Sequence, residues 1–189
     1  MIMGSTALAI STLLIFGSNF AATTLNVKAQ QEPQLLENNN SSTVTSSSRA
    51  KEQDFVAAYV KLVNDSRSLT QQYQTEVGKW QNKDYSNNTM ASITDDYLPK
   101  FQQLVDRARN DLQPTEKYKS AQDYMVQSLD SERQSYEHFR NYLLTGNPAE
   151  NETSTQFFTE AFLYEEKSFE AFKAAGGNSG SHDNTTYSL

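Results

Sequence analysis

The stretch 115–144 constrains the fold of this chain more than any other, because it lacks proline and glycine and repeats apolar positions at helical spacing. The positions that recur every three or four residues are Tyr118, Ala121, Met125, Leu129, Glu132, Tyr136, Phe139 and Leu143. Such steps place side chains on one side of a helix. Pro114 suits the first helical position, so the sequence predicts a helix over 114–144. A single helix cannot bury its own stripe, so other helices must cover it.

Two earlier segments have the same periodicity. A helix is expected over 49–82 with Ser48 as its N-cap, and its inward positions are Phe55, Tyr59, Leu62, Ser66, Leu69, Tyr73, Val77 and Trp80. A second helix is expected over 89–112, with Met90, Ile93, Tyr97, Phe101, Leu104, Val105, Ala108 and Leu112 inward. Because an interior proline breaks a backbone bond, Pro99 predicts either a kink near Asp95 or a helix that starts near Asp96.

The last helix has the clearest local signal. Gly146 is expected to end the preceding helix. Asn147 can cap the next one, Pro148 suits its first position, and Glu150 can reach back as in a capping box. The helix should run to about Ala175, before two glycines, with Phe158, Phe162, Glu165, Phe169 and Phe172 inward.

The connections between these four segments are short. Short connections force consecutive helices to run antiparallel. The predicted fold is therefore all-α, an up-down-up-down antiparallel four-helix bundle over residues 49–175, with its second helix kinked or broken near Pro99.

The N-terminal segment has the features of an export signal. Residues 1–27 carry no charged side chain, and their apolar centre is Ala7 to Phe16. That length fits the apolar region of a signal peptide and is short for a membrane span. The small residues Val27 and Ala29 flank Lys28, which predicts cleavage after Ala29 and a secreted or extracytoplasmic protein. The alternative is an uncleaved anchor through residues 5–22.

Low-complexity segments flank the predicted bundle. Residues 30–48 are rich in Asn, Ser and Thr, and residues 176–189 have the same character. Such compositions do not bury enough apolar surface to offset the entropy of ordering, so they predict a disordered tether and a disordered tail. Asn-x-Ser/Thr sequons, which would make an exported chain a candidate glycoprotein, occur at Asn39, Asn40, Asn64, Asn87, Asn151 and Asn184.

Composition excludes several classes of function. The net charge is −7 and no basic cluster is present, which argues against binding nucleic acid or docking on anionic lipid by charge. The chain has no cysteine, which excludes thiol catalysis and Cys-ligated zinc. It also has no Gly-rich phosphate loop and no His-rich metal motif. We therefore expect no cofactor and no enzymatic activity.

Four acids form a candidate metal layer. Counting residues outward from each turn places Glu76, Asp95, Glu132 and Glu165 at one level of the bundle. Inward carboxylates from four helices are how bundle proteins hold metal, and oxygen ligands favour calcium, magnesium or manganese. The competing interpretation is that these acids are solvated or paired with arginine. The Glu-x-x-His pairs of di-iron bundles are absent, since Glu137 and His138 are adjacent.

The aromatic residues of the last predicted helix allow two interpretations. Aromatic side chains occur there at Phe157, Phe158, Phe162, Tyr164, Phe169 and Phe172. Core packing accounts for most of them. Because Phe157 and Tyr164 lie off the Phe158 stripe, a site for a small apolar ligand or a partner protein remains an alternative.

The order of these segments resembles small exported helical-bundle proteins of prokaryotes, with a style closest to archaeal ones. The resemblance lies in a signal segment, an Asn/Ser-rich tether, a Tyr-Leu-Pro sequence at 97–99 and a Leu-x-Pro helix opening at 112–114. It implies a binding or structural role at the cell envelope and transfers no site residue. The alternatives are a membrane-tethered extracytoplasmic sensor or adaptor domain and a carboxylate-bundle protein that binds a divalent cation.

Overall fold

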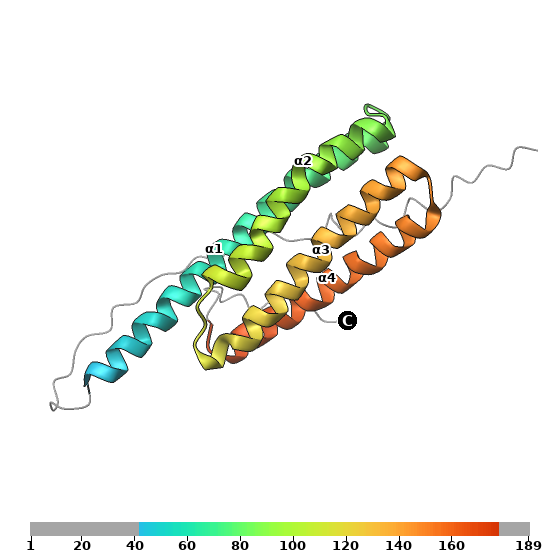
Figure 1. Cartoon of the computed structure of the whole chain (residues 1–189). Helices are drawn as coiled ribbons and strands as arrows, with labels where there is room; N and C mark the ends of the chain where they lie inside the picture. Colours follow the sequence, from blue (N-terminus) through green and yellow to red (C-terminus); the bar gives the residue numbers. More distant parts are fainter. Residues whose placement is uncertain (1–41, 178–189) are drawn as a thin grey trace, which may run out of the picture.

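The computed structural model describes residues 42–177, and the predictions for 1–41 and 178–189 lie outside that range. Within it, the chain is all-helical without strands, which confirms the predicted all-α class (Figure 1). The long helices are α1 Ser42–Gln81, α2 Asn87–Asp106, α3 Lys119–Thr145 and α4 Pro148–Ala174. A π-helical turn, η2 Arg107–Asp111, and a 3-10 turn, η3 Glu116–Tyr118, separate α2 from α3.

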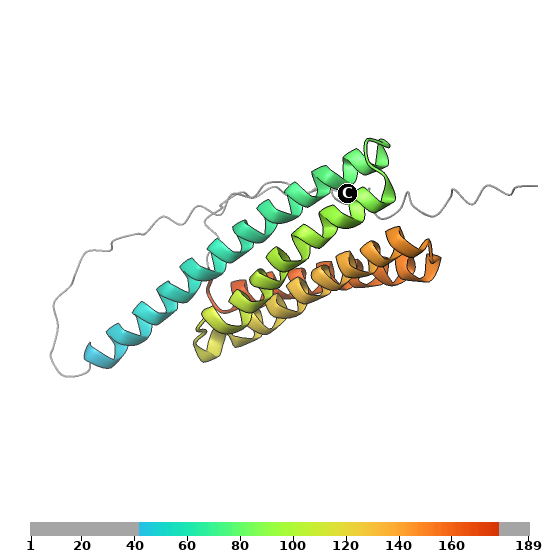
Figure 2. The same cartoon turned by 45° about the horizontal axis from the view of Figure 1, so that its top comes forward.

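The four helices pack as two neighbouring pairs. Helices α1 and α2 lie side by side, and α3 and α4 lie side by side (Figures 1 and 2). The α3–α4 contact is the most extensive in the fold, and α2 joins the pairs by packing on α3. The stripe predicted from Tyr118 to Leu143 is buried at every position except the half-buried Glu132.

Helix α1 begins at Ser42, earlier than the predicted Arg49. The last residues of the predicted tether, 42–48, are therefore helical, and Ser48 is not an N-cap. Once a helix exists, each added residue gains a hydrogen bond. Residues 42–48 contain no proline or glycine that would stop the helix. The first part of α1 extends beyond the other helices (Figure 2).

Helix α2 begins at Asn87 and continues through Pro99, so it does not start near Asp96. Ser86 is its N-cap, and the Ser86 hydroxyl accepts a hydrogen bond from the Thr89 N–H at 3.1 Å. Lys83 turns the chain between α1 and α2 with a φ of 68°.

The end of α2 differs from the expected plain helix to Leu112. The chain widens into η2, and the Leu112 N–H reaches back five residues to the Arg107 carbonyl. The Gln122 side-chain amide donates to the Ala108 and Leu112 carbonyls, each at 2.9 Å. Because α3 begins at Lys119, Pro114 lies in the connection and not at the first helical position.

The predicted turn between α3 and α4 is confirmed. Gly146 adopts a φ of 67°, which suits a residue without a Cβ, and ends α3. Asn147 caps α4 through the Ala149 N–H, and Pro148 follows it. Glu150 does not complete a capping box, because its carboxylate lies 2.8 Å from His138 Nδ1 on α3.

Two aromatic clusters lie in the core. In one, the Tyr73 ring lies against Tyr97, Phe101 and Tyr136 from α2 and α3. In the other, the Tyr59 ring stacks on Phe172 with centroids 4.3 Å apart. The second cluster also contains Phe55 and Tyr118.

Candidate functional site

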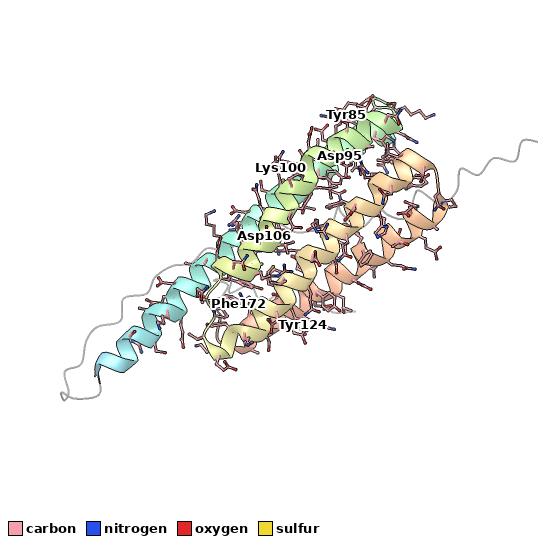
Figure 3. All side chains as sticks on the ribbon, in the orientation of Figure 1. Tyr85, Asp95, Lys100, Asp106, Tyr124 and Phe172 are labelled. Carbon is pink, nitrogen blue, oxygen red and sulfur yellow. The ribbon has the colours of Figure 1, made fainter. Side chains whose placement is uncertain are left out.

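The structure does not assemble the predicted four-acid layer, because two of the acids pair with other groups. Glu76 accepts hydrogen bonds from Lys79 and Tyr85, each at 2.9 Å. Asp95, on α2, binds the Arg140 guanidinium through both carboxylate oxygens, at 2.6 and 3.2 Å. Tyr85 and Asp95 lie toward the end of the molecule opposite Phe172 (Figure 3). The interpretation of paired acids holds for these two residues and, through Arg67, for Glu165.

Glu132 is a half-buried acid that faces inward. It lies on the inward stripe of α3, and its Oε1 accepts both the Thr70 hydroxyl of α1 at 2.7 Å and the Tyr136 hydroxyl at 2.9 Å. The residue remains half-buried, so water reaches part of it. Because Oε1 accepts both bonds, Oε2 is the oxygen that is free to hold a proton.

Glu165 lies near Glu132 and faces a cation on α1. Its Oε1 is 3.6 Å from Arg67 Nη2, and both side chains are less than one-third exposed. The Arg67 guanidinium also lies over the Phe169 ring of α4, 5.2 Å from the ring centroid. We call Arg67, Thr70, Glu132 and Glu165 the α1 acid cluster.

Burial shifts the proton equilibria of both acids upward. Desolvation raises the pKa of Glu132 to about 7, the hydrogen bonds from Thr70 and Tyr136 oppose this rise, and the charge of Glu165 adds to it. Desolvation also raises the pKa of Glu165, against the opposing effect of Arg67. Near neutral pH, Glu132 can therefore take up or release a proton.

We expect the stability of the fold to decline as the pH rises from 5 to 8. The folded pKa of Glu132 lies above its unfolded value of about 4.3. The stabilisation is therefore fully present below that unfolded value and is lost as the pH rises through about 7. Because the residue is half-buried, water screens part of the effect, and we expect a loss of about 1–2 kcal/mol in the free energy of unfolding.

The substitution Glu132→Gln tests this assignment. The amide keeps an acceptor oxygen for Thr70 and Tyr136 but cannot ionise, so urea unfolding at pH 8 should show a variant that is about 1–2 kcal/mol more stable than the parent. At pH 5 the two proteins should match. Glu137→Gln, at an exposed position of the same helix, is the control. A Glu132→Gln protein that is equally destabilised at both pH values would contradict the assignment.

Small side chains form the contact between α3 and α4. We call the six residues the Ala/Ser seam: Ala121, Ser128 and Ser135 of α3, and Ser154, Ala161 and Ser168 of α4. All six are buried. Serine hydroxyls cross it to backbone carbonyls, from Ser128 to Ala161 at 2.9 Å and from Ser135 to Ser154 at 2.8 Å. The residue numbers of these bonded partners rise along α3 and fall along α4, so the two helices are antiparallel.

The seam also receives a bond from α1. The Ser168 hydroxyl donates to the Ala121 carbonyl at 2.7 Å and therefore accepts its second bond, also 2.7 Å, from the Tyr59 hydroxyl. The seven-residue spacing of the small side chains was visible in the sequence. The larger aromatic side chains of α4 predict a different inward face, so this spacing does not stand out as the signal of a helix contact.

The aromatic side chains of α4 divide between two sides of the helix. Phe158 lies against Tyr136 in the core, but only Phe172 of the predicted inward stripe is fully buried. Phe157 and Tyr164 lie on another side of α4, where Phe157 stacks on His138 and Tyr164 stacks on Tyr124. Tyr124 lies in the same half of the hairpin as Phe172 (Figure 3).

These contacts limit the chemistry that the described residues can perform. Over residues 42–177, no three His, Asp or Glu side chains come together as a metal site. None of the helices in that range is both long and apolar enough to cross a membrane. What the α1 acid cluster does offer is reversible proton binding at a contact between helices.

No protein-family model, curated protein or solved structure matches this chain.

Proposed function

We propose that this chain is an exported helical-bundle protein with a binding or structural role at the cell envelope and no enzymatic activity. The observation that supports a binding role is the second aromatic side of α4. Phe157 and Tyr164 lie on the side of the Ala/Ser seam away from Phe158, and both are half-buried. Half-exposed aromatic side chains combine a large apolar area with low entropy cost, and they are enriched where proteins bind partners.

The arrangement we propose is an up-down-up-down bundle with a kink at Pro99. Hydrogen bonds between α1 and α2 support this topology. Tyr73 bonds Thr94, and Trp80 bonds Asn87, so the residue numbers of the bonded partners rise along α1 and fall along α2, as in antiparallel helices. Between α1 and α3 the residue numbers of contacting rings rise together, from Tyr73 with Tyr136 to Trp80 with Phe139. This is the arrangement that short connections favour. We place the chain among exported helical bundles of prokaryotes because its signal segment, its Asn/Ser-rich tether and the sequences at 97–99 and 112–114 resemble theirs.

A tethered sensor or adaptor domain is the second candidate. It is favoured by α1, which starts close to the N-terminal segment and extends beyond the other helices (Figure 2). The mass of the mature chain separates the two proposals. Loss of residues 1–29 supports the exported protein, and their retention in a membrane fraction supports the tethered domain.

The binding role is tested by thermal melts of the full chain with indole, as a small apolar probe, and with calcium, magnesium or manganese. A ligand that binds only the folded state stabilises it by about 2.7 kcal/mol at a hundredfold excess over its Kd. We expect indole to raise the melting midpoint, because it can stack beside Tyr124 and Tyr164.

Matched variants locate the indole site. Tyr164→Ser should reduce the shift, while Glu160→Ser, at an exposed position of the same helix, should leave it unchanged. A flat response to indole would contradict a small-ligand role and leave the structural one. A shift with one cation that Glu132→Gln abolishes would instead support the divalent-cation proposal.

A further inference from the structure

We propose that the α1 acid cluster is a proton-controlled clasp, which holds α1 on the α3–α4 hairpin while Glu132 is protonated and loosens when Glu132 ionises. This device goes beyond a binding or structural role, because it gives the bundle a way to respond to external pH. The proposal rests on where the cluster lies, on its charge balance, and on its contrast with the Ala/Ser seam.

The cluster occupies the middle of the contact between α1 and the hairpin. Toward the start of α1 the contact is aromatic, with Tyr59 stacked on Phe172. Toward its end the contact is aromatic again, where the Trp80 and Phe139 ring centroids are 5.4 Å apart. At the middle level Thr70 bonds Glu132, and Arg67 lies 3.6 Å from Glu165, so two carboxylates from the hairpin face α1 there.

The charges at this level do not balance when both acids are ionised. The Arg67 guanidinium lies beside Glu165, and the charge of Glu165 acts on Glu132. Tyr136 of α3 and Thr70 of α1 are neutral donors to Glu132, and α2 contributes no charged group to either acid within the described residues. Ionised Glu132 therefore adds a second negative charge beside a single guanidinium, in a position short of water.

Protonation removes this imbalance without breaking a bond. The proton enters at Oε2 of Glu132, while Oε1 keeps its bonds from Thr70 and Tyr136. Glu165 then keeps its contact with Arg67 and no longer faces a second negative charge on Glu132. Deprotonation reverses these steps. The proton leaves Glu132 Oε2 for solvent through the exposed part of the residue.

The contact between α3 and α4 does not respond in this way. The Ala/Ser seam is closed by hydroxyl groups bonded to backbone carbonyls, and neither group titrates in the physiological range. Deprotonation should therefore weaken the hold of α1 while α3 and α4 remain closed on each other. Since α2 packs more extensively on α3 than on α1, we expect α1 to open as a local unit.

Hydrogen exchange of the full chain, followed by mass spectrometry at pH 6 and pH 8 and corrected for intrinsic rates, tests the clasp. Peptides from 62–74 of α1 should show an opening equilibrium that is about tenfold more favourable at pH 8. Peptides from 121–135 of α3 should change by less than twofold. An equal change in all four helices, or no change in α1, would overturn the proposal.

Two variants keep the test decisive. Glu132→Gln should remove the pH dependence of the α1 peptides, and Glu137→Gln should retain it. If Glu132→Gln fails to fold, Glu165→Gln gives a second measurement. By removing the neighbouring negative charge, it should shift the midpoint of α1 opening to lower pH, and an unchanged midpoint would overturn the coupling between the two acids.

Discussion

Replacing Tyr73 with alanine should destabilise the fold by about 3–5 kcal/mol, a large part of the stability of an ordinary domain. The Tyr73 ring is fully buried and touches aromatic rings from α2 and α3. Its removal leaves a cavity at the point where three helices meet. It also removes the donor to the Thr94 hydroxyl, at 2.9 Å, which itself donates to the Met90 carbonyl.

Urea unfolding at pH 6 measures this loss of stability, and a second variant separates the contribution of the ring from that of the hydroxyl. Tyr73→Phe keeps the ring and loses only the hydroxyl, so it should cost about 1 kcal/mol. Gln71→Ala, at an exposed position of the same helix, should change stability by less than about 0.5 kcal/mol. A loss below about 1 kcal/mol for Tyr73→Ala would mean that the ring is not the centre of the core.

The second large effect is expected for Ala161→Leu, in the middle of the Ala/Ser seam. Ala161 is only 7% exposed, and its carbonyl accepts the Ser128 hydroxyl. A leucine would force α3 away from α4, which should cost about 1–3 kcal/mol for overpacking and about 1 kcal/mol for the hydrogen bond.

The matched control adds a leucine to the same helix outside the seam. Thr159 is exposed, so Thr159→Leu should be nearly neutral in the same unfolding measurement. Ala161→Ser should also be tolerated, because serine occupies the equivalent seam positions Ser154 and Ser168. If Ala161→Leu matched Thr159→Leu, then α3 and α4 would not be in close contact at this level.

Local sequence patterns were sufficient for the helices and several of their ends. The stripe from Tyr118 to Leu143 and the stripe from Phe55 to Trp80 both face the core, because helical spacing is a property of the backbone itself. The turn at Gly146 and the cap at Asn147 followed from residues in direct contact along the chain. The prediction that Pro114 opens a helix was wrong, because a proline suits a connection as well as a first helical turn and the local pattern does not distinguish the two.

The site depended on distances between helices, which no local pattern contains. Glu76, Asp95, Glu132 and Glu165 were equivalent acids near inward stripes. A shift of one or two residues in how two helices align decides whether such an acid meets a lysine, an arginine or the core. The π-helical turn η2 adds a residue at the end of α2 and so changes how α2 aligns with its neighbours. The small side chains of the Ala/Ser seam fix how α3 aligns with α4.

By itself the sequence determined that this chain forms four helices with aromatic inward faces, because side-chain periodicity and turn residues act within a few positions of one another. Only the tertiary structure decided that Glu132 is the acid enclosed by protein, that Glu165 meets Arg67, and that α3 and α4 join through serine and alanine. The physical reason is that desolvation and charge pairing depend on residues far apart in the chain, whose spacing is set by the packing of whole helices.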